Sequence, residues 1–277
     1  QPQQGAGPRA RMNPEPPVPS PPDLNPGLVE LIDLVAERQR ADFGHMASDL
    51  KSDGSLITAC DRWSDATLVE GLARLFPGEG VLSEEGNKAV PKTSAYWVVD
   101  PLDGTTNFAA GIPYWAISIA RFEAGRPVLA VLDVPPLRQR IVAIRGQGAW
   151  RNGRPLLAPS GQSHPAGCAS LCSRSIGVLQ KLPNQRFPGK IRLLGVASLN
   201  LVSVAMGQTI SALEATPKIW DLAAAWLVLS ELDCPIRWLV RSPESIDAGS
   251  DLSAADFPVL AADRPETLAR FMPWADA

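Results

Sequence analysis

The sequence D-P-L-D-G-T-T-N-F, residues 100–108, constrains this chain more than any other segment. It follows the apolar run 96–99, which predicts a buried strand that places a carboxylate at its C-terminal end. The proline prevents a regular strand ladder, and the glycine after the second aspartate lets the backbone turn tightly. Asp100, Asp103 and the Leu102 carbonyl can therefore point toward one place.

Two interpretations of this turn fit its spacing. If a helix begins directly after the turn, its free N–H groups would bind an anion such as phosphate beside a metal ion. Alternatively, Asp100 and Asp103 cap backbone groups of an Asx turn, because a D-P-x-D-G string is common in turns. Magnesium ions require oxygen ligands and use few carboxylates each, so these two aspartates with Glu84 and Asp221 would suffice for two or more ions.

Composition excludes several other classes of function. The chain carries 26 lysines and arginines against 29 aspartates and glutamates, so charge alone would not draw it to nucleic acid or to an anionic membrane. We therefore expect neither as a partner. Four scattered cysteines are too few for a disulfide scaffold, and no signal-peptide pattern opens the sequence. We expect a cytoplasmic protein.

The pattern along the chain divides it into three parts. Residues 1–24 are rich in Gln, Pro and Gly and predict a disordered tail. Residues 25–159 predict an antiparallel α+β half that carries most of the metal ligands, and residues 160–277 predict an α/β half that completes the site. The expected elements are a helix that Asn25 caps, a helix over 61–76, strands over 115–122, 128–134 and 139–144, a helix over 198–206, a strand over 210–214 and a helix over 220–232.

A second sequence motif, W-D-L-A-A at residues 220–224, makes the motif at 100–108 more specific. Together, about 120 residues apart and in this order, they resemble the two signatures of the inositol monophosphatase family of Mg²⁺-dependent phosphatases. The resemblance extends over residues 27–271. It implies an α/β fold, a layered α-β-α-β-α sandwich of the inositol monophosphatase and fructose-1,6-bisphosphatase type.

The resemblance also implies roles for single residues. Thr105 and Glu84 would position a water molecule for attack, and Asp61 would help bind a weaker metal ion through water. Two or three Mg²⁺ ions are expected per active site. The implied metal ligands are Glu84, Asp100, the Leu102 carbonyl, Asp103 and Asp221; the implied substrate contacts are Asp103, Gly104, Thr105, Glu214 and Asp221.

With this resemblance, the sequence predicts a Mg²⁺-dependent phosphomonoesterase that hydrolyses inositol monophosphate or a similar small polyol phosphate. Water is the expected nucleophile, because His45 and His164 are the only histidines and neither belongs to a nucleophile motif. The alternatives are a histidinol-phosphatase, a 3′(2′),5′-bisphosphate nucleotidase or fructose-1,6-bisphosphatase of the same family, or a non-catalytic regulatory member. The segments 51–55 and 113–116 favour the first two. By resemblance we expect inhibition by Li⁺ and a homodimer.

Overall fold

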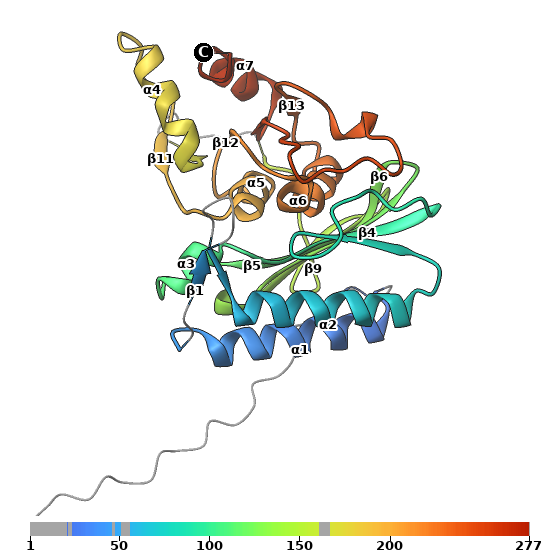
Figure 1. The fold of residues 1–277 in the computed structure, drawn as a ribbon. Helices are drawn as coiled ribbons and strands as arrows, with labels where there is room; N and C mark the ends of the chain where they lie inside the picture. The colour runs from blue at the N-terminus through green and yellow to red at the C-terminus, as the bar shows by residue number, and fades with distance from the viewer. Residues whose placement is uncertain (1–20, 22–23, 46–47, 51–55, 161–166, 277) are drawn as a thin grey trace, which may run out of the picture.

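Two β-sheets alternate with three layers of helices (Figure 1). The computed structural model describes residues 21, 24–45, 48–50, 56–160 and 167–276, so most of the predicted tail lies outside the described residues. The layered α-β-α-β-α sandwich is confirmed. The helices are α1 (Pro26–Asp42) and α2 (Ala59–Leu75) on one outer face, α5 (Ala197–Ala205) and α6 (Ile219–Glu231) between the sheets, and α7 (Pro265–Ala275) with the short α4 (Val178–Lys181) on the other outer face.

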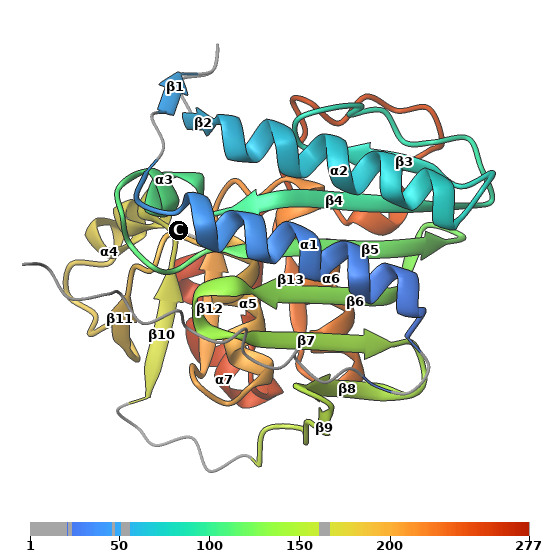
Figure 2. The same cartoon turned by 90° about the horizontal axis from the view of Figure 1, so that it is seen from below.

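The larger sheet is almost wholly antiparallel, and α1 and α2 cross one of its faces (Figure 2). Its seven strands follow the order of the chain, and only β3 runs parallel to its neighbour β4. Three predicted strands are confirmed to within two residues, as β5, β6 and β7. The strands are β3 (Gly80–Ser83), β4 (Ala95–Asp103), β5 (Ala116–Glu123), β6 (Arg126–Val134), β7 (Gln139–Ile144), β8 (Gly148–Arg151) and β9 (Arg154–Pro155).

Strand β4 is longer than the sequence predicted. It continues past Val99 and through Pro101, and its register with β5 shifts between Asp100 and Asp103. A register shift tolerates proline, because the missing N–H falls where the ladder is already interrupted. The irregularity therefore lies at the segment that carries the two aspartates.

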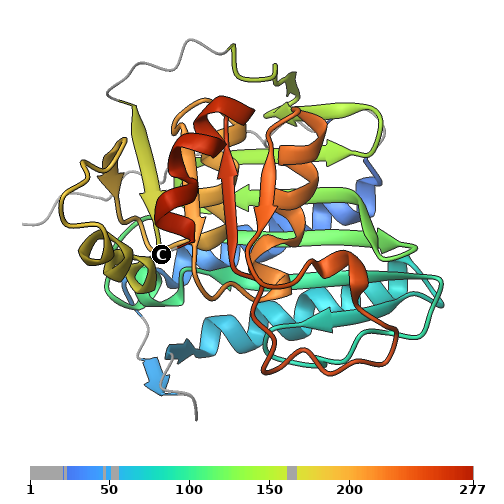
Figure 3. The ribbon, with the colours of Figure 1, turned by 90° about the horizontal axis from the view of Figure 1, so that it is seen from above.

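The smaller sheet is mixed and lies beneath α7 in the view of Figure 3. Its order is β11-β10-β12-β14-β13, with β10 parallel to both of its neighbours and β14 antiparallel to both of its own. The strands are β10 (Cys168–Leu171), β11 (Lys190–Arg192), β12 (Ser211–Glu214), β13 (Ile236–Trp238) and β14 (Val259–Ala262). The remaining elements are β1 (Ser48–Leu50), β2 (Leu56–Thr58), α3 (Thr105–Ala109) and the 3₁₀ helices η1 (Pro135–Leu137), η2 (Ser173–Gly177) and η3 (Pro243–Ser245).

Capping residues set where the first two helices begin. The Asn25 side chain accepts hydrogen bonds from the N–H groups of Gly27 and Leu28, so α1 begins at Pro26 as predicted. Helix α2 begins at Ala59, two residues before the expected start, because Thr58 and Asp61 form a capping box. Asp61 is thereby held in the first turn of α2.

The middle layer holds the two sheets together. Helices α5 and α6 are buried on nearly all sides, as expected for helices between two sheets. Trp226 of α6 contacts Phe122 of the larger sheet and Trp238 of the smaller one in edge-to-face pairs. One continuous core therefore includes residues from both predicted halves, and the division at residue 159 stays a prediction. No helix among the described residues has the length and apolarity to cross a bilayer.

Candidate active site

Three carboxylates from separate elements converge at the end of the middle layer. Glu84 follows β3, Asp100 lies in β4, and Asp221 lies in the first turn of α6. One carboxylate oxygen of each lies within 4.8 Å of the others. Backbone bonds fix two of them: the Glu84 N–H donates to the Val99 carbonyl at 3.1 Å, and the Lys218 N–H donates to Asp221 Oδ2 at 2.7 Å. The topology thus creates a cluster that the sequence order does not show.

The cluster brings like charges together in a site where Asp100 is buried and Glu84 and Asp221 are partly buried. Burial, followed by repulsion from neighbouring carboxylates, raises the pKa of Asp100 and of Asp221 well above the usual value. Burial also raises the pKa of Asp103 to about 6, although hydrogen bonds from Ser198 oppose the rise. Within the described part of the chain, no lysine, arginine or histidine forms an ion pair with these three aspartates. The site therefore favours protons or a cation.

The turn after Asp103 is fixed by a glycine and by α5. Gly104 has φ +102°, and a Cβ there would lie 2.8 Å from Val196 Cγ2. The Ser198 N–H donates to Asp103 Oδ2 at 2.7 Å, which ties the start of α5 to the turn. Helix α3 begins at Thr105, as one interpretation of the sequence expected, but it has only 5 residues. The role of its N–H groups toward phosphate stays a prediction.

Thr105 and Asp61 form a hydrogen-bonded pair beside the turn. The Thr105 hydroxyl lies 2.6 Å from Asp61 Oδ1 and 3.1 Å from the Leu102 carbonyl oxygen. The other oxygen of Asp61 accepts hydrogen bonds from the N–H and the hydroxyl of Thr58. Asp61 is therefore oriented by the capping box of α2, with one oxygen left for Thr105.

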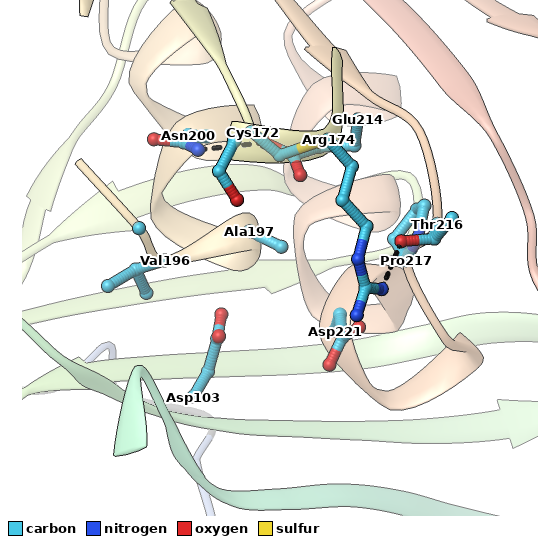
Figure 4. Close-up of a pocket in the computed structure, with 12 residues that line it drawn as sticks. Asp103, Cys172, Arg174, Val196, Ala197, Asn200, Glu214, Thr216, Pro217 and Asp221 are labelled. Carbon is cyan, nitrogen blue, oxygen red and sulfur yellow. Dashed lines mark hydrogen bonds between the residues drawn. The ribbon is translucent and has the colours of Figure 1, made fainter. Parts of the chain in front are cut away.

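A pocket of about 260 Å³ opens beside Asp103 and Asp221 (Figure 4). Glu214, at the end of β12, lines it and accepts a hydrogen bond of 2.8 Å from Asn200 of α5. Burial raises the pKa of Glu214 to about 7, despite the opposing hydrogen bonds from Asn200 and Cys172. The pocket therefore connects the acidic cluster with a further carboxyl group, that of Glu214, whose pKa lies near 7.

The structure brings the predicted site residues to one region. Glu84, Asp100 and Asp221 form the cluster, Asp103 and Glu214 line the adjoining pocket, and the Leu102 carbonyl contacts the Thr105–Asp61 pair. Segment 51–55, which the sequence related to other phosphatases, lies outside the described residues.

Sequence reasoning missed most of the residues that line the pocket, among them Asn200, Cys172 and Arg174. Asn200 could have been found from the sequence, because a lone amide inside the apolar stretch 193–213 needs a hydrogen-bond partner when it is buried. No local pattern indicates Arg174, since its hydrogen-bond partner Thr216 lies 42 residues further along the chain.

Comparison with known proteins gives consistent matches. Residues 28–245 match the model of the inositol monophosphatase family. The chain is 35% identical over 213 residues to a histidinol-phosphatase of Mycobacterium tuberculosis, covering 73% of this chain and 82% of that protein. It is 31% identical over 207 residues to a Nus factor SuhB of Pseudomonas aeruginosa, covering 70% and 76%. A solved IMPase/NADP phosphatase with Mg²⁺ and phosphate superposes with a TM-score of 0.71 at 25% identity, covering 88% of this chain and 91% of that one.

Proposed function

The chain belongs to the inositol monophosphatase family and is a phosphoric monoester hydrolase, and on that basis we propose that it releases phosphate from inositol monophosphate or a similar small polyol phosphate. One observation carries the proposal. One carboxylate oxygen from each of Glu84, Asp100 and Asp221 lies within 4.8 Å of the others, beside a pocket that Glu214 also lines. Such a site offers one end to a phosphate group and the other to the alcohol that leaves.

The donor set fits a divalent cation. Hard ions such as Mg²⁺ take oxygen ligands, and a bound cation would stabilise the charged carboxylates that burial disfavours. We propose that two or three Mg²⁺ ions are held by Glu84, Asp100, Asp221, Asp103 and the Leu102 carbonyl. Bound there, Mg²⁺ would neutralise the phosphate oxygens and lower the pKa of a coordinated water.

Thr105 and Asp61 are placed to move a proton during the attack. When the Thr105 hydroxyl donates to Asp61 Oδ1, its oxygen lone pairs remain free to accept a hydrogen bond from a water molecule. As that water attacks phosphorus, its proton passes to Thr105 and the proton of Thr105 passes to Asp61. Glu84 would share the positioning of the water, a role that rests on the family.

Residues at the other end of the pocket would receive the alcohol. The carboxyl group of Glu214, oriented by Asn200, can accept a hydrogen bond from a substrate hydroxyl. Asp221 has one oxygen fixed by the Lys218 N–H, and its other oxygen would position a water that protonates the leaving oxygen. The backbone N–H groups of Gly104 and Thr105, with Asp103, would orient the phosphate.

The test is a panel of esters assayed for phosphate release with and without Mg²⁺. It contains inositol 1-phosphate, histidinol phosphate, 3′-phosphoadenosine 5′-phosphate and fructose 1,6-bisphosphate. We expect a Mg²⁺-dependent rate with the polyol phosphate that Asp100→Asn abolishes, because the substitution removes a buried charge from the cluster. Asp276→Asn, which removes an exposed charge at the end of α7, is the control. A rate that survives Asp100→Asn would contradict the proposal.

Histidinol phosphate is the second candidate substrate. The relative at 35% identity is a histidinol-phosphatase, and a protonated amine would pair with Glu214 at least as well as a hydroxyl would. The same panel separates the two, because the preferred ester has the higher kcat/KM. If a nucleotide bisphosphate or fructose 1,6-bisphosphate has the highest kcat/KM, neither inositol monophosphate nor histidinol phosphate is the preferred substrate.

A non-catalytic role is the third outcome of the panel. A relative at 31% identity is named a Nus factor, so the expectation that nucleic acid is not a partner stays a prediction. Phosphate release from none of the esters by folded protein that binds Mg²⁺ would favour this role. Inhibition by Li⁺, a homodimer and a cytoplasmic location also remain proposals that rest on the family.

A further inference from the structure

Arg174 stands out among the described residues that line the pocket. It carries the only positive charge there, against the three carboxyl groups of Asp103, Glu214 and Asp221. It lies in η2, the short 3₁₀ helix that follows β10, and its side chain points into the pocket toward Thr216, Pro217 and Asp221 (Figure 4). Nothing in the proposed reaction uses it.

The backbone around Arg174 is fixed against β12. The Cys172 N–H and the Ser175 hydroxyl both donate to the Leu213 carbonyl, at 3.2 and 3.1 Å. The Ala215 N–H donates to Cys172 Sγ at 3.3 Å. Because Leu213 and Ala215 flank Glu214, these bonds hold η2 beside the carboxyl group that would receive the alcohol. The backbone of Arg174 is therefore held in place at the leaving-group end of the pocket.

The guanidinium group is oriented but not neutralised. One of its nitrogens lies 2.6 Å from Thr216 Oγ1 and donates to it. Within the described part of the chain, Arg174 forms no ion pair with a carboxylate. A guanidinium group has five N–H donors in a planar fork, so most of them remain for a ligand.

The chemistry of the two ends of the pocket indicates what that ligand is. In the proposed function, Glu214 and Asn200 bind neutral hydroxyl groups, and the reacting phosphate lies beside the proposed metal ligands Asp103 and Asp221. A planar, oriented guanidinium matches a carboxylate or a phosphate, which it binds through two parallel N–H bonds. We propose that Arg174 binds a second anionic group, a carboxylate or a phosphate, on the leaving alcohol, and so sets the preference among esters. The inference rests on the proposed phosphatase function.

Matched ester pairs test this inference. Fructose 1,6-bisphosphate is compared with fructose 1-phosphate, and 2-phosphoglycerate with glycerol 2-phosphate; the second member of each pair lacks the second anion. We expect the native protein to prefer the anionic member of at least one pair. Arg174→Met should lower that ratio of kcat/KM by about tenfold or more, mainly through KM, because a charge-assisted hydrogen bond is lost. The pair affected tells whether the anion is a phosphate or a carboxylate.

Two further variants make the result specific. Arg126→Met removes another exposed arginine, at the start of β6 and at the opposite end of the larger sheet from Asp103, and should leave the ratio as in the native protein. Arg174→Lys keeps the charge but not the planar fork and should restore part of the preference. A ratio that Arg174→Met does not change, or an equal loss for both members of a pair, would overturn the inference, as would a native protein without a preference for the anion.

A binding measurement separates failure of this inference from failure of the proposed function. If the native protein hydrolyses none of the esters, the proposed function fails, and binding of fructose 6-phosphate and of fructose is compared by calorimetry. Tighter binding of the phosphorylated sugar, lost in Arg174→Met and kept in Arg126→Met, supports the role of Arg174 without turnover. Equal binding of both sugars overturns it.

Discussion

At the scale of single residues, the turn after β4 depends on Gly104. Its φ of +102° suits glycine, and a Cβ would also meet Val196 at 2.8 Å. We expect Gly104→Ala to lower the free energy of unfolding by about 2–4 kcal/mol, because strain and a close contact add. Phosphate release should fall further than stability alone explains, since Asp103 and Thr105 flank the turn. Chemical denaturation and the ester assay measure the two effects.

Gly111→Ala is the matched control for Gly104→Ala. Gly111 also has a positive φ, +74°, but nothing lies within 4 Å of its added Cβ. It should show the cost of backbone strain alone, about 1 kcal/mol, with phosphate release preserved. Equal losses of stability and activity in the two variants would mean that the contact with Val196 does not hold the turn.

Glu214 makes stability depend on pH. Burial raises the pKa of its carboxyl group from 4.5 to about 7 in the folded protein. Between these values the folded protein holds a proton that the unfolded chain has lost, so the free energy of unfolding falls as pH rises from about 4.5 to about 7. Glu214→Gln keeps an acceptor for Asn200 but cannot titrate, and should remove this part of the pH dependence, on the order of 3 kcal/mol at most.

The measurement for Glu214→Gln is denaturation of metal-free protein at several pH values. Above pH 7 the variant should be more stable than the native protein, and below pH 4.5 the two should converge. Asp256→Asn, which removes a carboxylate paired with Lys218 near the surface, is the control. A slope between pH 4.5 and 7 that is as steep in Glu214→Gln as in the native protein would place the titrating group elsewhere.

At the scale of elements, Gln39 of α1 joins four segments around the site. It is fully buried; its amide nitrogen donates to the Pro101 carbonyl at 2.7 Å and to Ser64 of α2 at 3.1 Å, and its oxygen accepts from the Trp115 indole at 3.0 Å. Gln39→Leu would leave these buried groups without partners. We expect a loss of about 2–4 kcal/mol in unfolding free energy and a lower rate of phosphate release, because Pro101 lies between the two aspartates of β4.

Glu37→Leu tests whether the loss belongs to position 39. It places the same residue on the exposed face of the same helix, where a substitution changes stability by about 0.5 kcal/mol or less. Urea denaturation with the ester assay compares the two. If Gln39→Leu behaves like Glu37→Leu, Gln39 does not position the irregular segment of β4.

Local signals in the sequence predicted those elements that carry them. The cap at Asn25 and the apolar spacing after it gave α1 its start, and alternation with turn residues gave β5 to β7. The capping box at Thr58 was present in the sequence and would have given the start of α2. The passage of β4 through Pro101 could not be predicted, because it depends on a register shift against β5, a non-local contact.

The same distinction applies to the site. The carboxylates sit in motifs that can be recognised, so Glu84, Asp100, Asp103 and Asp221 could be predicted, and the structure brings them together. The partner that orients Asp103 could not, because it comes from a remote element. Ser198 reaches Asp103 across 95 residues of sequence. Hydrogen-bond partners at such separations follow from the packing of the layers and leave no periodic signal.

At the scale of the whole molecule, the site links both sheets. Asp100 belongs to the larger sheet, Asp221 begins a helix of the middle layer, and Glu214 ends a strand of the smaller sheet. A cation held between the first two therefore binds only the folded chain and should stabilise it as a unit, by about 2.7 kcal/mol at a concentration 100 times the dissociation constant. Stability of the folded protein and metal binding are then one linked equilibrium.

This linkage predicts how Mg²⁺ acts at different pH values. Because Asp100 and Asp221 have raised pKa values, protons compete with the metal, and Mg²⁺ should raise the melting temperature of metal-free protein more at pH 8 than at pH 5.5. Asp221→Asn should reduce this shift and also make the metal-free protein more stable at pH 8, since one of the crowded carboxylates is gone. Asp276→Asn should follow the native protein in both respects. If Mg²⁺ raises the melting temperature of Asp221→Asn as much as that of the native protein, the ion binds elsewhere. If metal-free Asp221→Asn is less stable than the metal-free native protein, the carboxylates do not repel one another in the folded chain.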